Sequence, residues 1–269
     1  MTLCNHRKLR GHFGRQLRLL DDLETLALER IKAYSAAAIA MDARGFYVAF
    51  SGGKDSVVLL DLVKRSGVPY TAHYHLTTVD PPELVNFIRS SYPDVEVHRP
   101  ALTMWQLIKK RKMPPRRNAR FCCEVLKEGG GVGRVVTTGV RWAESSRRSK
   151  RQMTEPCLRN RRKRYFHPII DWKDTDVWGY IHERGLAYCR LYDEGFKRVG
   201  CVLCPMTHKT ARDLARWPKL CKAWERAVKA TFKPGGDKKH VFKDAESYWQ
   251  WWLDRRTPAF NGDEESLFT

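Results

Sequence analysis

Residues 46–60 carry the feature that most constrains the fold of this chain, an apolar run that breaks into a small polar loop and then resumes as an amphipathic segment. Residues 46–50 are rich in aromatic and β-branched side chains, as in a buried strand. Residues 55–64 place apolar side chains on one broad helical face. The stretch therefore predicts a strand, a tight polar turn and a helix in succession.

The loop, Ser51-Gly-Gly-Lys-Asp-Ser56, has the chemistry of a phosphate site. Gly52 and Gly53 have no Cβ, so the backbone can turn sharply and bring N–H groups to an anion at the positive end of the helix. Hydroxyl donors and a cation are supplied by Ser51, Lys54 and Ser56. The pattern G-x-x-x-x-G-K-[ST] is not satisfied, which argues against an ordinary Walker A loop. A polyphosphate is the expected ligand, and Asp55 is expected either to assist catalysis or to orient the loop.

Strand and helix patterns alternate along the following residues. Strand patterns recur at residues 70–75, 95–98 and 134–140, and helical patterns at 82–91, 102–112 and, with Asp174 as the N-cap, 174–184. This alternation predicts an α/β fold with a doubly wound, mainly parallel sheet. Ligands of such sheets bind beyond the carboxyl ends of the strands, where the loop at Ser51 and the turn at Gly139 are expected to lie.

Helical patterns also mark both ends of the chain. Residues 15–42 have leucines at helical spacing, and residues 209–232 and 245–254 indicate two C-terminal helices. The tryptophans of the last helix, at positions 249, 251 and 252, are expected to pack against the body rather than to stack on bases. We therefore predict three parts: a helical segment at 1–45, a nucleotide-binding domain at 46–206 and a helical extension at 207–269.

The charge of the chain points to an acidic partner. The formal net charge is +20, and residues 106–120 carry seven basic groups and no acidic one. Residues 141–164 carry ten basic groups against two acidic ones. Nucleic acid is the favoured partner, although a solvated basic surface, or clusters that bind only nucleotide phosphates, would have the same composition. The sequence has no long apolar run and no signal-peptide pattern, so we expect a cytoplasmic protein without a membrane partner.

Four of the eight cysteines form two pairs, Cys122-Cys123 and the C-x-x-C turn of Cys201 and Cys204. Folding could bring these pairs together as a site of four thiolates. Adjacent cysteines are awkward ligands for one tetrahedral zinc ion, whereas a [4Fe-4S] cluster offers separate iron corners, so the cluster is favoured over zinc. The isolated cysteines, Cys4, Cys157, Cys189 and Cys221, are expected to be structural.

Five motifs together resemble the phosphoadenosine phosphosulfate reductase family of the PP-loop superfamily. They are the loop 51–56, Cys122-Cys123 followed by Lys127, Thr138-Gly-Val-Arg-Trp-Ala-Glu-Ser145 with Arg147 and Arg148, the segment 166–178, and Gly200-Cys-Val-Leu-Cys-Pro205. They occur in the order of the family and cover residues 46–206.

The resemblance implies a nucleotide site. In this family the loop holds phosphate, Gly139, Arg141 and Glu144 would lie on the opposite lip, and Arg147 or Arg148 would face the anionic part of the substrate. Lys54, Asp55 and Arg141 are then the expected catalytic residues. The cysteine pattern is similar to that of the adenylyl-sulfate reductase branch, which implies a [4Fe-4S] cluster on Cys122, Cys123, Cys201 and Cys204, faced by Lys127.

One departure from the family shifts the expected reaction. Sulfonucleotide reductases attack sulfur with a cysteine near the C-terminus, whereas here no cysteine follows Cys221, and the segment around Cys221 has a helical pattern. The chain thus resembles the ATP pyrophosphatase of DNA phosphorothioation systems, which implies ATP, Mg²⁺, a DNA or tRNA acceptor and a sulfur donor such as a cysteine desulfurase. A reductase of adenylyl sulfate and a non-catalytic iron–sulfur protein that binds nucleic acid remain the alternatives, and the oligomeric state is not predicted.

Overall fold

The computed structural model describes residues 6–207, 210–234 and 242–254, with side chains from residue 20 onward. The chain divides into two compact units. The sheet unit comprises residues 1–75, 82–98 and 130–199, and the helical unit comprises residues 76–81, 99–129 and 200–269. This division differs from the expected three consecutive parts, because residues 99–129 pack with the C-terminal helices and not with the sheet on either side of them in sequence.

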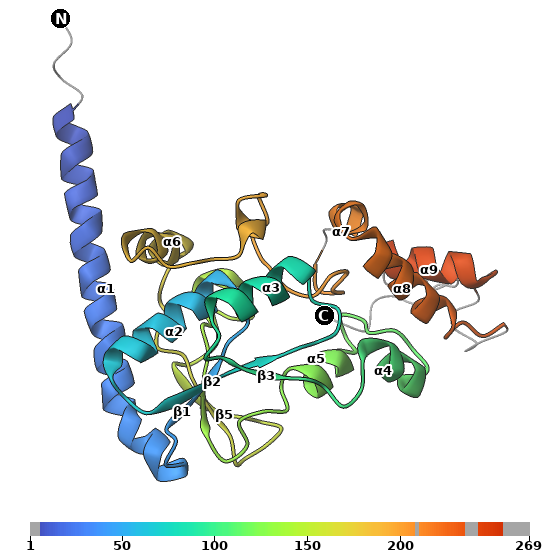
Figure 1. Ribbon diagram of the computed structural model, residues 1–269, viewed down its shortest axis with the longest axis horizontal. Helices are drawn as coiled ribbons and strands as arrows, with labels where there is room; N and C mark the ends of the chain where they lie inside the picture. The colour runs from blue at the N-terminus through green and yellow to red at the C-terminus, as the bar shows by residue number, and fades with distance from the viewer. Residues whose placement is uncertain (1–5, 208–209, 235–241, 255–269) are drawn as a thin grey trace, which may run out of the picture. The chain divides into compact units, whose positions relative to one another are not determined.

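The sheet unit contains one six-stranded sheet, with the strand order β3-β2-β1-β4-β6-β5 (Figure 1). The strands are β1 Phe46–Ala49, β2 Tyr70–His75, β3 Glu96–His98, β4 Val135–Thr137, β5 Thr154–Pro156 and β6 Arg164–Phe166. All neighbouring pairs are parallel except β5 and β6, which confirms the predicted mainly parallel α/β fold. Strands β5 and β6 were not expected, because they are short and lie in a segment dominated by charge rather than by apolar alternation.

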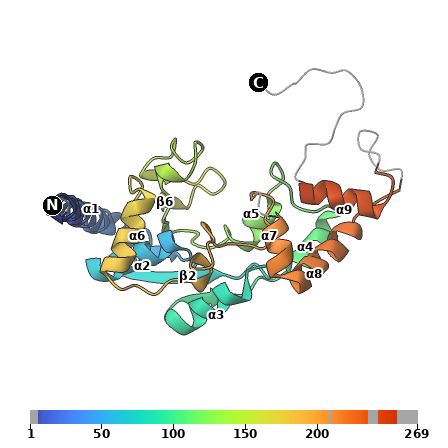
Figure 2. The same cartoon turned by 90° about the horizontal axis from the view of Figure 1, so that it is seen from above.

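Helices α1 His6–Met41, α2 Lys54–Ser66, α3 Pro82–Ser91 and α6 Asp174–Glu183 belong to the same unit. Helix α2 begins directly after the polar loop and ends at Gly67, whose φ of 71° needs a residue without a Cβ. Its apolar face is buried, as are Ala27 and Ile31 of α1. Figures 1 and 2 show α1 beside α2 and α6. Helix α1 is one continuous helix over the described residues.

The helical unit contains α4 Met104–Arg111, α5 Phe121–Leu126, α7 Thr210–Arg216, α8 Pro218–Lys229 and α9 Ala245–Asp254. The single helix predicted over residues 209–232 is wrong, because Pro218 has no N–H to donate and begins a new helix, α8, after Trp217. The cysteine pair lies on the short helix α5, which the Arg-rich sequence around it did not indicate.

Tryptophan side chains form the core of the helical unit. The ring of Trp224 stacks on that of Trp252 with centroids 5.0 Å apart and meets Trp105 edge-on at 5.3 Å. Trp249 and Trp252 are buried, and the indole N–H of Trp252 donates to the carbonyl of Pro115 over 2.8 Å. Packing of the C-terminal tryptophans, rather than base stacking, is therefore confirmed for Trp249 and Trp252.

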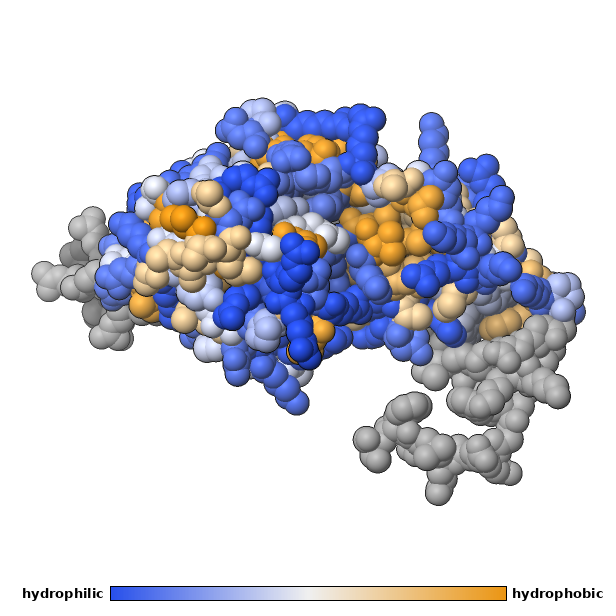
Figure 3. Space-filling model, turned by 90° about the horizontal axis from the view of Figure 1, so that it is seen from below, coloured by the Kyte–Doolittle hydropathy of each residue, from blue (hydrophilic) through white to orange (hydrophobic). Residues whose placement is uncertain are grey.

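The described surface is strongly hydrophilic. Figure 3 shows hydrophilic residues over most of the face it presents, with a few separate apolar patches. None of the helices in the described ranges has the length and apolar character needed to cross a membrane.

Candidate functional site

A pocket in the sheet unit lies where β1 and β4 end. The polar loop lines one side with Ser51, Gly53, Asp55 and Ser56. The other lining residues come from the segment after β4, from the turn that follows it and from the region of η2 Arg190–Tyr192. They are Thr138, Gly139, Val140, Glu144, Arg148, Tyr192, Arg198 and Val199. The pocket thus occupies the position at which α/β sheets bind ligands.

Two hydroxyl groups hold the loop in shape. The Ser51 N–H and the Ser51 hydroxyl lie 3.2 Å and 3.1 Å from Ser56 Oγ, and the Ser56 hydroxyl donates to the carbonyl of Gly53 over 2.8 Å. Gly52 has a φ of 69° and is buried, and a Cβ there would lie 2.7 Å from Leu84 Cδ1. The turn therefore depends on a glycine at position 52.

The first turn of α2 faces a tyrosine of η2. The N–H of Lys54 donates to Tyr192 Oη over 2.9 Å, so the phenol oxygen occupies a position that suits an anion at the start of a helix. Burial raises the pKa of Tyr192, and the phenol is neutral at physiological pH. No sequence pattern indicated Tyr192.

Beside the pocket, Lys54 and Arg141 form an ion-pair network with two aspartates. Lys54 Nζ lies 3.1 Å from both Asp55 Oδ1 and Asp174 Oδ1. Arg141 Nε lies 2.8 Å from Asp55 Oδ1, and its Nη2 lies 2.5 Å from Asp174 Oδ1. Both cations are almost completely buried, and neither lines the pocket. Two positive and two negative groups balance, so this network offers little free positive charge to a phosphate.

The network favours the charged forms of Asp174 and Arg141. Burial alone would raise the pKa of Asp174, but hydrogen bonds from Arg141 and Lys54 outweigh it and lower that pKa. Burial alone would lower the pKa of Arg141, but the charges of Asp55 and Asp174 raise it instead. Asp174 and Arg141 thus remain charged at neutral pH.

The cations that line the pocket are two arginines. Arg148 pairs with Glu144, whose Oε1 also accepts the N–H of Arg141 over 3.1 Å. Arg198 is exposed and makes no ion pair with any residue that the structure describes. Arg147 is exposed and lies outside the lining. Of the two arginines that the sequence suggested, Arg148 therefore lines the pocket and Arg147 does not. Arg198 also lines the pocket, although no motif indicated it.

The helical unit brings the two cysteine pairs together. Cys122 and Cys123 lie on α5, and Cys201 and Cys204 lie in the loop that precedes α7. A hydrogen bond with Cys123, then burial and the nearby Cys201 and Cys204, raise the pKa of Cys122 far above its usual range. The hydrogen bond from Cys122 and another from Arg120, over 3.5 Å, lower the pKa of Cys123 to about 5. The four thiols are thus close enough for a charge on one of them to change the pKa of another.

Polar groups and one lysine surround Cys201. Its sulfur lies 3.4 Å from Thr77 Oγ1 and 3.9 Å from Asp80 Oδ1. The charge of Cys201 raises the pKa of Lys127, against the opposing effect of burial. Lys127 therefore lies beside the cysteine group, where it can balance thiolate charge.

Comparison with known proteins assigns the family. The model of the phosphoadenosine phosphosulfate reductase domain matches residues 45–207, more than half of the chain. The chain belongs to this family. It is 24% identical over 200 residues to the adenosine 5′-phosphosulfate reductase of Staphylococcus epidermidis, covering 68% of this chain and 80% of that one. A solved phosphoadenylyl-sulfate reductase from Candida auris, with phosphate, covers 68% of this chain and 93% of its own at a TM-score of 0.50 and 18% identity, which shows a shared fold.

A longer relative matches almost the whole chain. The Methanocaldococcus jannaschii protein MJ0973 is 25% identical over 260 residues, which are 91% of this chain. The chain spans about 60% of the length of that relative. The similarity therefore extends beyond the reductase domain, into the residues of the helical extension.

The remaining cysteines that the structure describes lie in the protein interior. Cys157, Cys189 and Cys221 are buried, and the Cys221 thiol donates to the carbonyl of Asp213 over 3.4 Å. Burial raises the pKa of Cys221 to about 11, so this thiol is not ionised at neutral pH. Cys4 lies outside the described residues.

The sequence identified Asp174 only as an N-cap, but the structure gives it a larger role. The N-cap of α6 is Lys173, and Asp174 instead joins Lys54 and Arg141 from 120 and 33 residues away. A contact of such separation leaves no periodic signal in the sequence. The sequence offered two hints, the family motif at residues 166–178 and the acidic first turn of α6.

We expect Asp174→Asn to weaken the fold at neutral pH. The pKa of Asp174 lies below its ordinary 3.8, so its ion pairs stabilise the native state above that value and are lost as the pH falls through the lowered native value. We expect a loss of about 1–2 kcal/mol in the free energy of unfolding at pH 7, less than the about 3–5 kcal/mol of a buried pair, because the Asp174 side chain is 66% exposed.

Urea unfolding at pH 7 and pH 3 measures this effect. The difference between variant and parent should shrink at pH 3, where Asp174 of the parent begins to lose its charge. Asp94→Asn is the matched control, since Asp94 is 84% exposed and lies 3.9 Å from Lys64. Equal stability of Asp174→Asn and parent at pH 7 would show that the network contributes nothing to folding.

Proposed function

We propose that this protein is an ATP pyrophosphatase that adenylylates an acceptor, so that sulfur can then be incorporated into nucleic acid. The observation that carries the choice of ATP over a sulfonucleotide is the burial of Cys157, Cys189 and Cys221. Attack on sulfur needs an accessible thiolate, and these three side chains do not supply one. The loop at Ser51, with its helix N-terminus, supports a polyphosphate ligand in the adjoining pocket.

In the proposed reaction, an acceptor oxygen attacks the α-phosphorus of ATP. The bond from that phosphorus to the bridging oxygen of the β-phosphate breaks, and pyrophosphate leaves with the electron pair. Arg148 and Arg198 line the pocket and would stabilise the charge on this leaving group. The acceptor then carries adenylate, which a sulfur nucleophile displaces.

Magnesium fits the pocket by its donor chemistry. The lining contains the carboxylates of Asp55 and Glu144 and the hydroxyl of Ser51, which are hard oxygen ligands. Mg²⁺ on the phosphates would neutralise the leaving pyrophosphate. Asp55 has a second role, because it links the pocket to Lys54 and Arg141. We therefore assign Lys54 and Arg141 to positioning Asp55 and the loop.

The cysteine group fits a [4Fe-4S] cluster on Cys122, Cys123, Cys201 and Cys204. Four thiols gather beside Arg120 and Lys127, whose charges suit an anionic cluster. The adjacent Cys122 and Cys123 suit the separate iron corners of a cluster better than one tetrahedral zinc ion, so we favour the cluster, which would supply redox chemistry when bound.

A nucleic acid acceptor is supported by charge. Residues 147–162 of the sheet unit expose several cations, among them Arg147, Lys150, Arg161 and Arg162. Such a basic surface favours the phosphate backbone of DNA or tRNA. A sulfur donor such as a cysteine desulfurase would complete the reaction. DNA phosphorothioation and tRNA thiolation are the two reactions of this type that we propose.

The test is release of pyrophosphate from ATP by anaerobically purified protein with Mg²⁺ and either DNA or tRNA. We expect Arg198→Ala to lower kcat/KM about tenfold or more, because a cation of the pocket lining is lost. Arg89→Ala is the matched control, because Arg89 is exposed, lies outside the lining and is not part of the basic surface at residues 147–162. The proposal fails if ATP releases no pyrophosphate under these conditions while adenylyl sulfate releases sulfite.

A sulfonucleotide reductase is the second candidate. The hydrogen bond from Cys122 and the nearby Arg120 lower the pKa of Cys123, which favours its thiolate form, and the residue is partly exposed. A thiolate of this kind could act as a nucleophile if it is not a cluster ligand. Thioredoxin-dependent release of sulfite from adenylyl sulfate, lost in Cys123→Ser, would support this reaction.

A further inference from the structure

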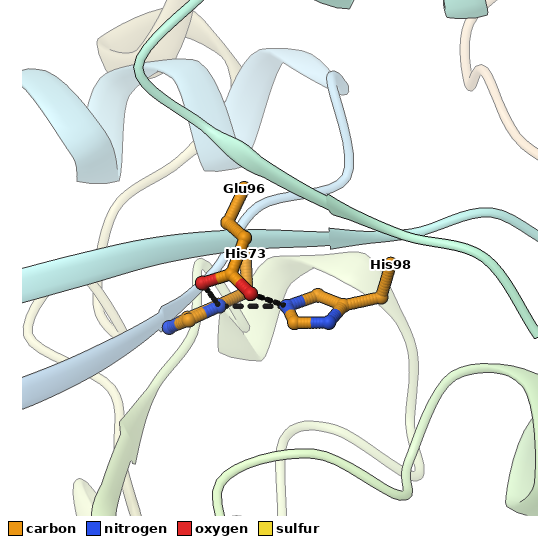
Figure 4. A group of neighbouring side chains, drawn as sticks. All are labelled: His73, Glu96 and His98. Atoms are coloured by element: carbon orange, nitrogen blue, oxygen red, sulfur yellow. Dashed lines mark hydrogen bonds and ion pairs between the residues drawn. The ribbon is translucent and has the colours of Figure 1, made fainter.

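Three ligand-type side chains converge on one face of the sheet, at the edge formed by β2 and β3. The parallel register pairs His73 with Glu96 and His75 with His98, so His73, Glu96 and His98 lie on the same face (Figure 4). His73 Nδ1 lies 2.8 Å from His98 Nε2, and the Glu96 carboxylate oxygens lie 3.3 Å from His73 Nδ1 and 3.5 Å from His98 Nε2. The ligand atoms of the three side chains thus lie close enough together to bind one metal ion.

These separations match the ligand shell of a zinc ion. Ligands at about 2.0–2.1 Å from a tetrahedral zinc ion lie about 3.3–3.4 Å from one another. The two Glu96 distances are close to this value, but the one to His73 Nδ1 is from Oε2 and the one to His98 Nε2 is from Oε1, so the carboxylate must turn to offer one oxygen to the ion. The two imidazole nitrogens must separate by about 0.5 Å. His98 lies on the edge strand with a side chain that is 32% exposed, so it has room to move.

The surroundings of His73 favour metal binding through Nδ1. Its other ring nitrogen, Nε2, lies 2.7 Å from Thr71 Oγ1, and a hydrogen bond of this kind orients metal-binding histidines in many proteins. Burial lowers the pKa of His73 to about 4, so the ring is neutral near pH 7. Thr71 also accepts from Arg134 Nη1 over 2.6 Å, and the carboxylate of Glu96 offsets this nearby positive charge.

We propose that His73, Glu96 and His98 bind a zinc ion. The ion replaces the proton that the two imidazoles share, and a water molecule completes the tetrahedron from the solvent side, where the Glu96 side chain is 63% exposed. His75 stays outside this shell, because its Nε2 is hydrogen bonded to the Tyr47 hydroxyl over 2.6 Å. The bound ion would tie the three-residue edge strand β3 to β2.

The experiment measures zinc bound to the full chain after equilibrium dialysis, with X-ray absorption at the zinc edge. The cysteine group can also take zinc, so the two sites are separated by ligand distance: nitrogen and oxygen at about 2.0–2.1 Å here, sulfur at about 2.3 Å there. We expect His98→Ala and Glu96→Gln to lose about one zinc ion per chain together with the nitrogen and oxygen shell.

His182→Ala is the matched control, because His182 is an exposed histidine of the same unit outside the group. Zinc should raise the Tm of the parent and of His182→Ala by more than it raises the Tm of Glu96→Gln. Glu96→Gln also covers the case in which His98→Ala does not fold, since the Glu96 side chain is mostly exposed. Equal zinc content in all variants, or a shell of sulfur alone, would overturn the proposal.

Discussion

Gly139→Ala is expected to lower kcat/KM for pyrophosphate release from ATP by at least about 100-fold. A displacement of reacting groups by about 1 Å reduces the rate by about this factor. A Cβ at position 139 would lie 2.6 Å from the backbone oxygen of Asp55 and 2.8 Å from its carbonyl carbon. Both contacts are to backbone, so no side chain can rotate away. The start of α2 must instead move away from the end of β4, and the pocket changes shape.

The measurement is pyrophosphate release, with ATP binding by calorimetry as a second readout. Gly129→Ala is the matched control, since a Cβ there meets no atom within 4 Å. Its activity should equal that of the parent. Circular dichroism and Tm separate a local change of the loop from loss of the fold. Full activity in Gly139→Ala would show that the pocket between the loop and this turn does not bind the reacting nucleotide.

Cys201→Ser is expected to cause the largest loss of iron from the cysteine group. The parent, purified without oxygen, should contain about four iron atoms per chain and absorb broadly in the visible range, and the variant should contain fewer than about one. A serine hydroxyl is a poor iron ligand compared with a thiolate, and Lys127 would lose the sulfur whose charge contributes most to raising its pKa. Iron and sulfide analysis, with the absorption spectrum, measures the result.

Cys221→Ser serves as the control for this change. Cys221 lies in the same unit, is buried in α8 and donates only to the carbonyl of Asp213, which a hydroxyl can do equally well. Its iron content should match that of the parent. If the parent binds no iron under the same conditions, the cluster is absent, and sulfur ligands in the X-ray absorption of any bound zinc would then identify the cysteine group as a zinc site.

The local pattern predicted the elements around the loop closely. Strand β2 occupies residues 70–75 as expected, and α3 begins at Pro82 and ends at Ser91 as expected. These elements have strong periodicity and clear start and stop residues, so neighbours in sequence specify them. Strands β5 and β6 and helix α5 have neither. Strand β6 pairs with β4 and β5 pairs with β6, so these strands depend on distant partners. Helix α5 belongs to the unit that contains the C-terminal helices.

For the site, residue chemistry indicated the ligand types, whereas folding selected which groups face the ligand. The serines and glycines of the loop were identified correctly as a connected turn between β1 and α2. Lys54 and Arg141, by contrast, face aspartates, and Arg148 and Arg198 line the pocket. Composition cannot distinguish these four cations, because each would bind a phosphate equally well if it were exposed.

The sequence by itself thus determined the α/β class, the strand, loop and helix that begin the pocket, and the two cysteine pairs, because each depends on residues close together in the chain. The tertiary structure alone decided that Asp174 neutralises Lys54 and Arg141, that residues 99–129 fold with the C-terminal helices, and that His73, Glu96 and His98 meet at a sheet edge. Each of these depends on a packing or strand register between distant segments, and side-chain periodicity within one segment carries no information about it.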